Sequence, residues 1–122
     1  MNNALRHTDG ELITVIDADF VPFKNFLTRT VGFFQRKEID LVQTPQKFYN
    51  PDYFARNLGL EHLLPGDLEH FYGFVQPSRD VGNSVICCGT SYVIRRSSLK
   101  AVGGYYTRCC VEDFQTSVLE DV

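Results

Sequence analysis

The first third of the chain contains an apolar run, a helical pattern and a second apolar run, one after another. Leu12–Ile16 is almost wholly apolar and β-branched, with Thr14 as its one polar residue, which is typical of a strand buried on both faces of a mostly parallel sheet. Apolar residues then recur every three or four positions, which predicts a helix from Pro22 to about Lys37. A second strand is predicted over Ile39–Thr44, where Pro45 stops it. Strand, helix and strand form a βαβ unit, which implies a right-handed crossover between parallel strands.

The middle of the chain changes to aromatic, helix-like sequence and then returns to short apolar runs. Asn50–Phe74 is rich in aromatic residues and is predicted to be helical in two pieces, broken around Pro65-Gly66. Two further short strands are expected, over Ser84–Cys88 and Tyr92–Ile94, with Gly89 between them.

The last third of the chain predicts two helices. Ser97 is a suitable N-cap for a short helix over Leu99–Val102, which Gly103-Gly104 would end. A last helix is expected to begin near Glu112. Strands alternating with helices in this way predict an α/β fold.

Composition narrows the class of protein. With 122 residues, 43% of them hydrophobic, the chain is at most one ordered globular domain. Its net charge of -3 and its lack of a basic stripe argue against nucleic acid as a partner. No run approaches the roughly 20 apolar residues of a membrane span, and Met1–Arg6 lacks the apolar core of a signal peptide.

The four cysteines form two adjacent pairs, Cys87-Cys88 and Cys109-Cys110. Neither pair has the C-x-x-C spacing of a structural zinc site, although bridges between the two pairs are geometrically possible. Without a signal peptide, we interpret all four as reduced thiols in a cytosolic domain.

The clearest candidate for chemistry is Asp17-Ala18-Asp19, directly behind the first predicted strand. Ligands of such sheets bind beyond the carboxyl ends of the strands. Two aspartates one pleat apart can point the same way, and their oxygens suit Mg²⁺ or Mn²⁺ held jointly with phosphate oxygens. The alternative is a solvated turn.

A second acidic group, Glu112-Asp113, stands at the start of the last predicted helix. Acids there ordinarily act as caps or as partners of the helix dipole. The functional alternative is a carboxylate general base that faces the same crevice as Asp17 and Asp19.

Three other features allow two readings each. Gly89-Thr90 is either a point where the backbone approaches a ligand or a bulge. Arg95-Arg96 is more typical of a solvated edge than of a phosphate clamp. His62 and His70 are eight residues apart, but Pro65 interrupts the helix that would bring them onto one face, so a metal pair is disfavoured.

Taken together, these motifs identify a resemblance that covers essentially the whole chain. The chain resembles the processive family 2 glycosyltransferases, of the cellulose synthase catalytic-subunit kind. The matching stretches are Asn3-Ala4-Leu5 with Gly10-Glu11, Asp17-Ala18-Asp19-Phe20-Val21-Pro22, Val42-Gln43-Thr44-Pro45-Gln46 with Phe48, Tyr53-Phe54, Arg56-Asn57, Cys88-Gly89-Thr90, Arg95-Arg96 with Leu99, Gly103-Gly104 and Glu112-Asp113.

The resemblance implies roles for two acidic motifs. Asp17 and Asp19 resemble the motif that holds the divalent metal, Mg²⁺ or Mn²⁺, and the nucleotide diphosphate of the donor sugar. Asp113 resembles the catalytic base of a threonine-glutamate-aspartate motif that reads Val111-Glu112-Asp113 here. The departure at Val111 loses a hydroxyl and keeps both acids.

It also implies two substrate-binding stretches. Cys88-Gly89-Thr90 resembles the loop that meets the acceptor end of the growing glycan, with Cys87 in place of a phenylalanine. Gln43-Thr44-Pro45-Gln46 resembles a stretch on the floor of the donor and acceptor site.

The fold implied by the resemblance is an incomplete GT-A domain, a Rossmann-like mixed α/β sheet with flanking helices. Residues 1–122 would be a partial catalytic domain, without the N-terminal uridine-binding strands, the C-terminal acceptor motif and the membrane helices of the family. The parent protein would be embedded in the plasma (inner) membrane and act at its cytosolic face.

The implied activity is inverting, metal-assisted transfer of a hexose, glucose first of all, from a UDP-sugar to a β-linked polysaccharide acceptor such as cellulose. Two alternatives stay open. One is another product of the same class, namely chitin, hyaluronan or mannan, and the other is a truncated remnant without catalytic function.

Overall fold

The computed structural model describes residues 1–50, 52–64 and 66–108. The chain forms two compact units. The first, here called the sheet unit, consists of Met1–Thr44 and the part of the chain that begins at Ile86. The second, the helical unit, consists of Pro45–Val85.

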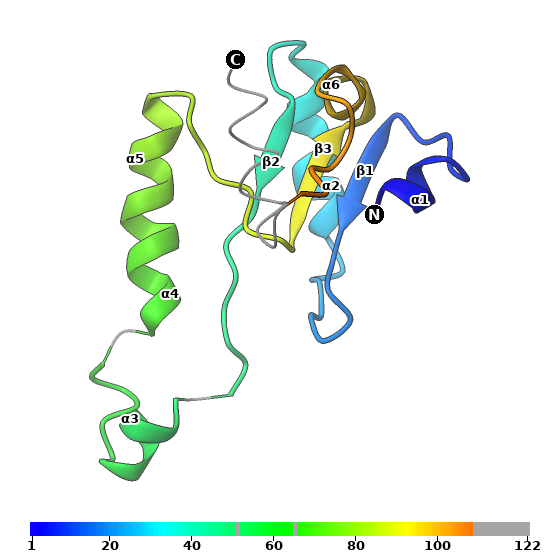
Figure 1. Cartoon of the computed structure of the whole chain (residues 1–122). Coiled ribbons are helices and arrows are strands. Elements are labelled where there is room, and N and C mark those ends of the chain that lie inside the picture. The colour runs from blue at the N-terminus through cyan, green and yellow to red at the C-terminus, as the bar shows by residue number, and fades with distance from the viewer. Residues whose placement is uncertain (51, 65, 109–122) are drawn as a thin grey trace. The chain divides into compact units, whose positions relative to one another are not determined.

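The sheet unit is built on three strands, β1 (Leu12–Val15), β2 (Leu41–Gln43) and β3 (Tyr92–Arg95), in the order β1-β3-β2 (Figure 1). Both outer strands pair antiparallel with β3, so β1 and β2 run in the same direction. The predicted parallel relation of the first two strands is therefore confirmed. They are not neighbours, however, because a strand from much later in the chain lies between them.

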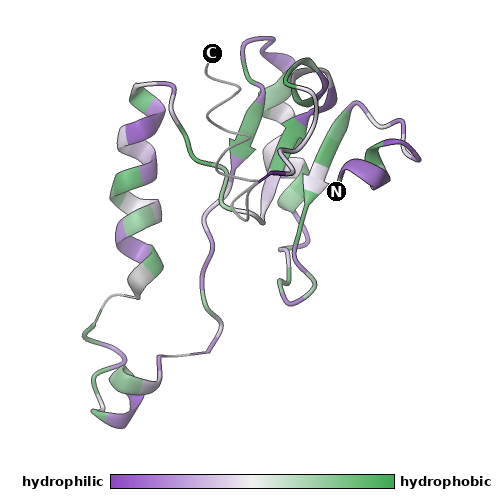
Figure 2. Cartoon of the chain, in the orientation of Figure 1, coloured by the Kyte–Doolittle hydropathy of each residue, from purple (hydrophilic) through white to green (hydrophobic). Residues whose placement is uncertain are grey.

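Burial in the sheet is concentrated in the middle strand. Tyr92 and Val93 are 0% exposed, whereas β1 is only half-buried and Thr14 on it is exposed. The expectation that Leu12–Ile16 is buried on both faces is wrong for the described chain, because β1 has one strand beside it. Figure 2 shows that β1 is largely hydrophobic, which is the property on which that expectation was based. The buried hydrophobic cluster of the sheet unit consists of Cys87, Tyr92, Ile94, Leu99 and Tyr105.

The connection between β1 and β2 is helical, as predicted, but shorter and less regular. α2 (Phe26–Thr30) begins four residues after Pro22 and passes into a 3₁₀ segment, η1 (Val31–Gln35). The Thr30 hydroxyl donates to the Phe26 carbonyl at 2.9 Å, a bond that competes with the α-helical ladder. The α-helix therefore gives way to a tighter turn after Thr30.

The helical unit starts with α3 (Tyr53–Asn57), which Asp52 caps by accepting a bond from the Ala55 N–H at 2.9 Å. A second helical run begins after the predicted break at Gly66, with α4 (Asp67–His70). Two helical pieces on either side of this position are as predicted, but the second extends past Phe74.

After α4 the second helical run continues through a π-helical turn, η2 (Phe71–Val75), into α5 (Gln76–Val81). Pro77 lies at the start of α5 and has no N–H to donate, so the α-helical ladder is interrupted there and the wider turn precedes it. Hydrophobic and hydrophilic positions alternate along this helical run (Figure 2).

Two predictions are wrong for the segments just before and just after β3. Residues 84–88 are not a strand, because the Cys88 N–H is bound by a side chain, that of Gln43, instead of by a neighbouring strand. α6 (Arg96–Ala101) has Arg95 as its N-cap, so Ser97 lies inside the helix and does not cap it. Gly89 lies between this segment and β3, as expected.

The segment that follows α6 contacts α1 (Asn2–Leu5). α6 ends just before Gly103 and Gly104, as predicted, and both glycines have positive φ. A side chain at Gly104 would clash with Asn2, because a Cβ there would lie 2.8 Å from its Oδ1. Asn2 also exchanges two hydrogen bonds with the Tyr105 backbone, at 2.7 and 2.8 Å. The helix predicted near Glu112 lies outside the described residues.

Candidate active site

The strand order brings three predicted motifs to one end of the sheet, which we call the site end. Val15 and Gln43 both pair with Tyr92, so the carboxyl ends of β1 and β2 meet the amino end of β3. Asp17 follows β1 closely, Gln43 is the last residue of β2, and Cys88–Ser91 (the 88–91 loop) leads into β3. Ligands of α/β sheets bind beyond the carboxyl ends of the strands, which is where these residues lie.

Asp17 is bound directly to the 88–91 loop. Its backbone N–H donates to Thr90 Oγ1 at 2.8 Å, a contact between residues 73 positions apart. Thr90 is 3% exposed, whereas the Asp17 residue is exposed. The loop therefore supports the backbone that carries the first aspartate.

Gln43 binds the same loop from the other side of β3. Its Oε1 accepts from the Cys88 N–H at 2.9 Å, and its Nε2 donates to the carbonyl oxygens of Thr90 at 3.0 Å and Ser91 at 3.4 Å. Thr44 adds two bonds to the Ser91 carbonyl, from its N–H at 3.0 Å and its hydroxyl at 2.6 Å. Donor and acceptor atoms of the Gln43 amide are thus both used to hold the loop.

The shape of the 88–91 loop depends on two residues with positive φ, Gly89 at 77° and Ser91 at 58°. Glycine adopts this conformation without a steric penalty. Because residues 84–88 are not a strand, Gly89-Thr90 belongs to a loop and is not a bulge between two strands. Ser91 was not recognised from the sequence, although a small polar residue directly before a buried strand was the available signal.

Asp17 and Asp19 are exposed, and they lie in a turn, not in an extended strand. The Phe20 N–H donates to the Asp17 carbonyl at 3.0 Å, which closes the turn. The argument that the two aspartates are one pleat apart is therefore wrong, because β1 ends at Val15 before they are reached. Both carboxylates are nonetheless on one short turn at the site end.

The residues present fit a metal that is shared with a ligand. Among the described residues, no group of three or more His, Cys, Asp or Glu side chains could enclose an ion. Two exposed carboxylates are hard oxygen ligands, and Mg²⁺ is commonly held by one or two carboxylates with substrate phosphates and water. Asp17 and Asp19 match that incomplete type of site.

Several predicted site residues are not brought together in this way. Pro45 belongs to the helical unit, where it is exposed. Glu112 and Asp113 lie outside the described residues, as do Cys109 and Cys110. Cys87 and Cys88 are thiols, as predicted. Cys87 is 4% exposed and belongs to the buried cluster, so it fills an apolar position.

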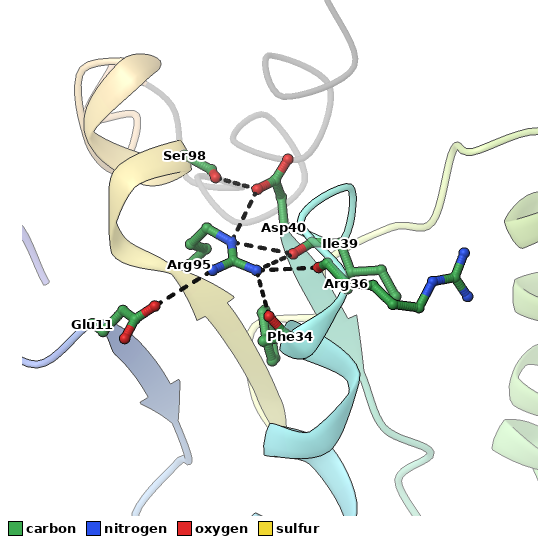
Figure 3. A network of polar contacts seen from close by, with 7 residues as sticks. All are labelled: Glu11, Phe34, Arg36, Ile39, Asp40, Arg95 and Ser98. Atoms are coloured by element: carbon green, nitrogen blue, oxygen red, sulfur yellow. Dashed lines mark hydrogen bonds and ion pairs between the residues drawn. The ribbon is translucent and has the colours of Figure 1, made fainter.

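Arg95 is at the opposite end of β3 and has a structural role (Figure 3). Its Nη2 donates to the carbonyl oxygens of Phe34 at 3.0 Å and Ile39 at 3.2 Å, and its guanidinium lies 5.4 Å from the Phe34 ring centroid. Glu11 and Asp40 each lie 3.6 Å from it. The side chain is 16% exposed, so the interpretation of a solvated edge is wrong.

Arg96 is buried more deeply than Arg95, with 9% exposure. It donates to the Gly10 carbonyl, to the Leu5 carbonyl at 3.2 Å and to Thr8 Oγ1 at 2.8 Å. A phosphate clamp is equally unsuitable as an interpretation, because both guanidinium groups already bind the protein's own oxygens.

His62 and His70, the pair for which a shared metal was disfavoured, both lie in the helical unit. His70 stacks on Phe74 with 5.7 Å between the ring centroids. No metal-binding cluster that includes it is found in the part of the chain that the structure describes.

Among the residues that the structure describes, no helix has both the length and the apolar character needed to cross a membrane.

Comparisons with known proteins all point to one protein family. Residues 1–103 match the family described as glycosyl transferase family 2. The chain is 40% identical over 119 residues to the cellulose synthase catalytic subunit [UDP-forming] of Pseudomonas fluorescens, and 38% identical over 119 residues to cellulose synthase 2 of Novacetimonas hansenii. Each match covers 97% of this chain but only 16% and 8% of those two proteins, respectively.

Proposed function

Because this chain belongs to glycosyltransferase family 2, we propose that it is part of the catalytic domain of an inverting hexosyltransferase. The donor would be a UDP-sugar, UDP-glucose first of all, and the acceptor a growing β-linked polysaccharide such as cellulose. The names of the similar cellulose synthases support this product. The observation that carries the proposal is the meeting of Asp17, Gln43 and the 88–91 loop at one end of the sheet.

In the proposed reaction, Asp113 acts as the general base. It takes the proton from an acceptor hydroxyl as that oxygen attacks the anomeric carbon of the donor sugar. The new carbon–oxygen bond forms on the face opposite the diphosphate, whose bond to the sugar breaks and whose oxygen keeps the electron pair. The anomeric configuration is inverted and UDP is released. Glu112 would contact the substrate beside it.

Asp17 and Asp19 would hold Mg²⁺ or Mn²⁺ together with the donor diphosphate. When bound, the ion would supply Lewis-acid stabilisation of the charge that develops on the departing diphosphate. The net charge of -3 gives the chain no general attraction for a diphosphate, and Arg95 and Arg96 bind the protein's own oxygens around the other end of β3, so a bound cation would offset the diphosphate charge. The turn that closes on Asp17 would present both carboxylates to the donor.

The acceptor would be bound by the 88–91 loop, with Cys88 and Gly89 in contact with the sugar. Thr90 lies in the same loop, and the resemblance assigns it to the acceptor as well. Gln43, Thr44 and Pro45 would form the floor of the site, with Gln43 and Thr44 acting through the bonds by which they hold the loop. The parent protein would be membrane-embedded and would work at the cytosolic face of the plasma membrane.

A chimera tests this proposal. The matched residues of this chain would replace the corresponding segment of the Pseudomonas fluorescens cellulose synthase catalytic subunit. We expect the chimera to release UDP from UDP-glucose and to form a β-glucan. Turnover only with UDP-N-acetylglucosamine or GDP-mannose would favour the other polysaccharide products. A folded chimera that turns over none of these donors would support the inactive remnant.

A further inference from the structure

We propose that Thr90 is a positioning residue that fixes Asp17, so that the loop assigned to the acceptor also sets the affinity for the metal and the diphosphate. This inference rests on the proposed function. It changes the role of Thr90 from a substrate contact to a support for the metal-binding turn.

The burial of the two residues supports this role. Thr90 is 3% exposed, and its hydroxyl oxygen accepts the Asp17 N–H at 2.8 Å. A side chain so deeply buried and so bonded is poorly placed to contact a sugar. Asp17 is exposed, so the Thr90 bond ties the start of an exposed turn to a buried atom.

Thr90 is itself held in place from the other side. Its carbonyl accepts from Gln43 Nε2 at 3.0 Å, and the Ser91 carbonyl accepts from Thr44 at 2.6 Å. Neighbouring elements therefore determine where the hydroxyl lies. A chain of bonds runs from the end of β2 through the 88–91 loop to the turn after β1.

The consequence concerns the metal ligands. An exposed turn that loses its anchor samples more conformations, and a metal that needs Asp17 and Asp19 together must select the productive ones. A single hydrogen bond to a neutral group typically corresponds to a change of about three- to tenfold in an equilibrium constant. We expect an effect of that size on metal affinity when the Thr90 hydroxyl is removed.

The test uses the chimera, isotope-labelled in the segment that comes from this chain, with Mn²⁺ and UDP. Paramagnetic broadening of the amides of residues 17–20 reports Mn²⁺ binding, and hydrogen exchange of the Asp17 amide reports the bond itself. Thr90→Val keeps the shape and removes the acceptor, whereas Thr90→Ser keeps the hydroxyl. Thr30→Val is the matched control, because Thr30 is also 3% exposed and its hydroxyl bonds within α2.

The proposal expects a protected Asp17 amide in the unsubstituted chimera and in Thr90→Ser, with normal Mn²⁺ binding in both. Thr90→Val should lose the protection and need roughly three- to tenfold more Mn²⁺, while Thr30→Val binds as the unsubstituted chimera does. Equal Mn²⁺ affinity in the unsubstituted chimera and Thr90→Val would overturn the positioning role and leave the proposed function intact. No Mn²⁺ binding by the unsubstituted chimera with UDP would overturn the proposed function and this inference with it.

If the Thr90→Val chimera does not fold, the unsubstituted chimera still decides the question. Rapid exchange of the Asp17 amide, as fast as that of an unbonded exposed amide, would contradict the anchoring bond. Slow exchange that is retained in Thr90→Ser would support it.

Discussion

The Oε1 atom of Gln43 accepts a hydrogen bond from the Cys88 N–H at 2.9 Å, across 45 positions of sequence. A residue whose motif is assigned to the floor of a substrate site therefore also holds the protein's own loop. The amide nitrogen of Gln43 also donates to the carbonyls of Thr90 and Ser91. Exchanging the positions of its oxygen and nitrogen would therefore break all of these hydrogen bonds.

The first prediction concerns this amide. Gln43→Glu removes both N–H donors and sets a carboxylate against carbonyl oxygens, so we expect the free energy of unfolding to fall by about 2 kcal/mol. Urea titration of the chain measures this change. Gln35→Glu on the exposed part of η1 is the control and should change stability little. Equal effects of the two substitutions would contradict the role of Gln43 in holding the loop.

The second prediction concerns Arg95. Arg95→Leu leaves the carbonyls of Phe34 and Ile39 without these donors, so we expect a loss of about 1–3 kcal/mol in unfolding free energy. Arg95→Lys should restore little of it, because an ammonium cannot reproduce the planar fork of donors. Glu11→Gln should have a minor effect, since the Glu11 side chain is 84% exposed. Thermal and urea unfolding of the three variants separate these outcomes.

The third prediction is a dependence of stability on pH. Burial raises the pKa of Tyr92 above its usual range, with further contributions from Cys87 and from the hydroxyl of Tyr105 at 3.0 Å. The neutral phenol is favoured in the folded state, so its contribution is complete below the unfolded pKa of about 10 and is lost as pH rises above it.

The expected slope above about pH 10 is a loss of roughly 1.4 kcal/mol per pH unit for this one group. Tyr92→Phe should make the decline shallower, although it removes a buried hydrogen bond at neutral pH. Tyr49→Phe is the control, because Tyr49 is 100% exposed. Identical pH profiles for wild type and Tyr92→Phe would show that Tyr92 does not cause the alkaline instability.

The fourth prediction concerns the proposed base. In the chimera, Asp113→Asn should lower the rate of sugar transfer by about 10²–10⁴-fold, because the acceptor hydroxyl loses its proton acceptor. The affinity for UDP should stay near that of the unsubstituted chimera, since the base contacts the acceptor and not the nucleotide. Steady-state UDP release and calorimetry measure the two quantities. Turnover within a few-fold of the parent would exclude Asp113 as the base.

The local parts of the fold could be predicted from the sequence because they depend on nearby residues. The apolar runs of β1 and β2, the helical spacing between them and the Gly103-Gly104 end of α6 all have short-range signals. The insertion of β3 between β1 and β2 has none, since strand order depends on contacts between distant segments. Residues 84–88 were read as a strand from their apolar character, but a side-chain bond from Gln43 takes the Cys88 N–H.

The candidate site could be predicted as a set of motifs but not as an arrangement. Nothing in the sequence indicates that the Asp17 N–H meets the Thr90 hydroxyl, because the two residues are 73 positions apart. The structural role of the two arginines has no short-range signal for a similar reason: most of their hydrogen-bond partners are backbone carbonyls of distant residues.

The central claim is that the site end of the sheet binds a divalent ion together with a nucleotide diphosphate, and calorimetry with the chimera tests it most directly. Mn²⁺ and UDP should bind cooperatively, since two carboxylates leave most of the metal's ligand positions to phosphate and water. Asp19→Ala should weaken Mn²⁺ binding in the presence of UDP by roughly tenfold or more, a cost typical of losing a charged ligand. Asp9→Ala, which removes an exposed carboxylate before β1, should leave Mn²⁺ binding unchanged. Equal Mn²⁺ affinity in the unsubstituted chimera and Asp19→Ala would contradict the account.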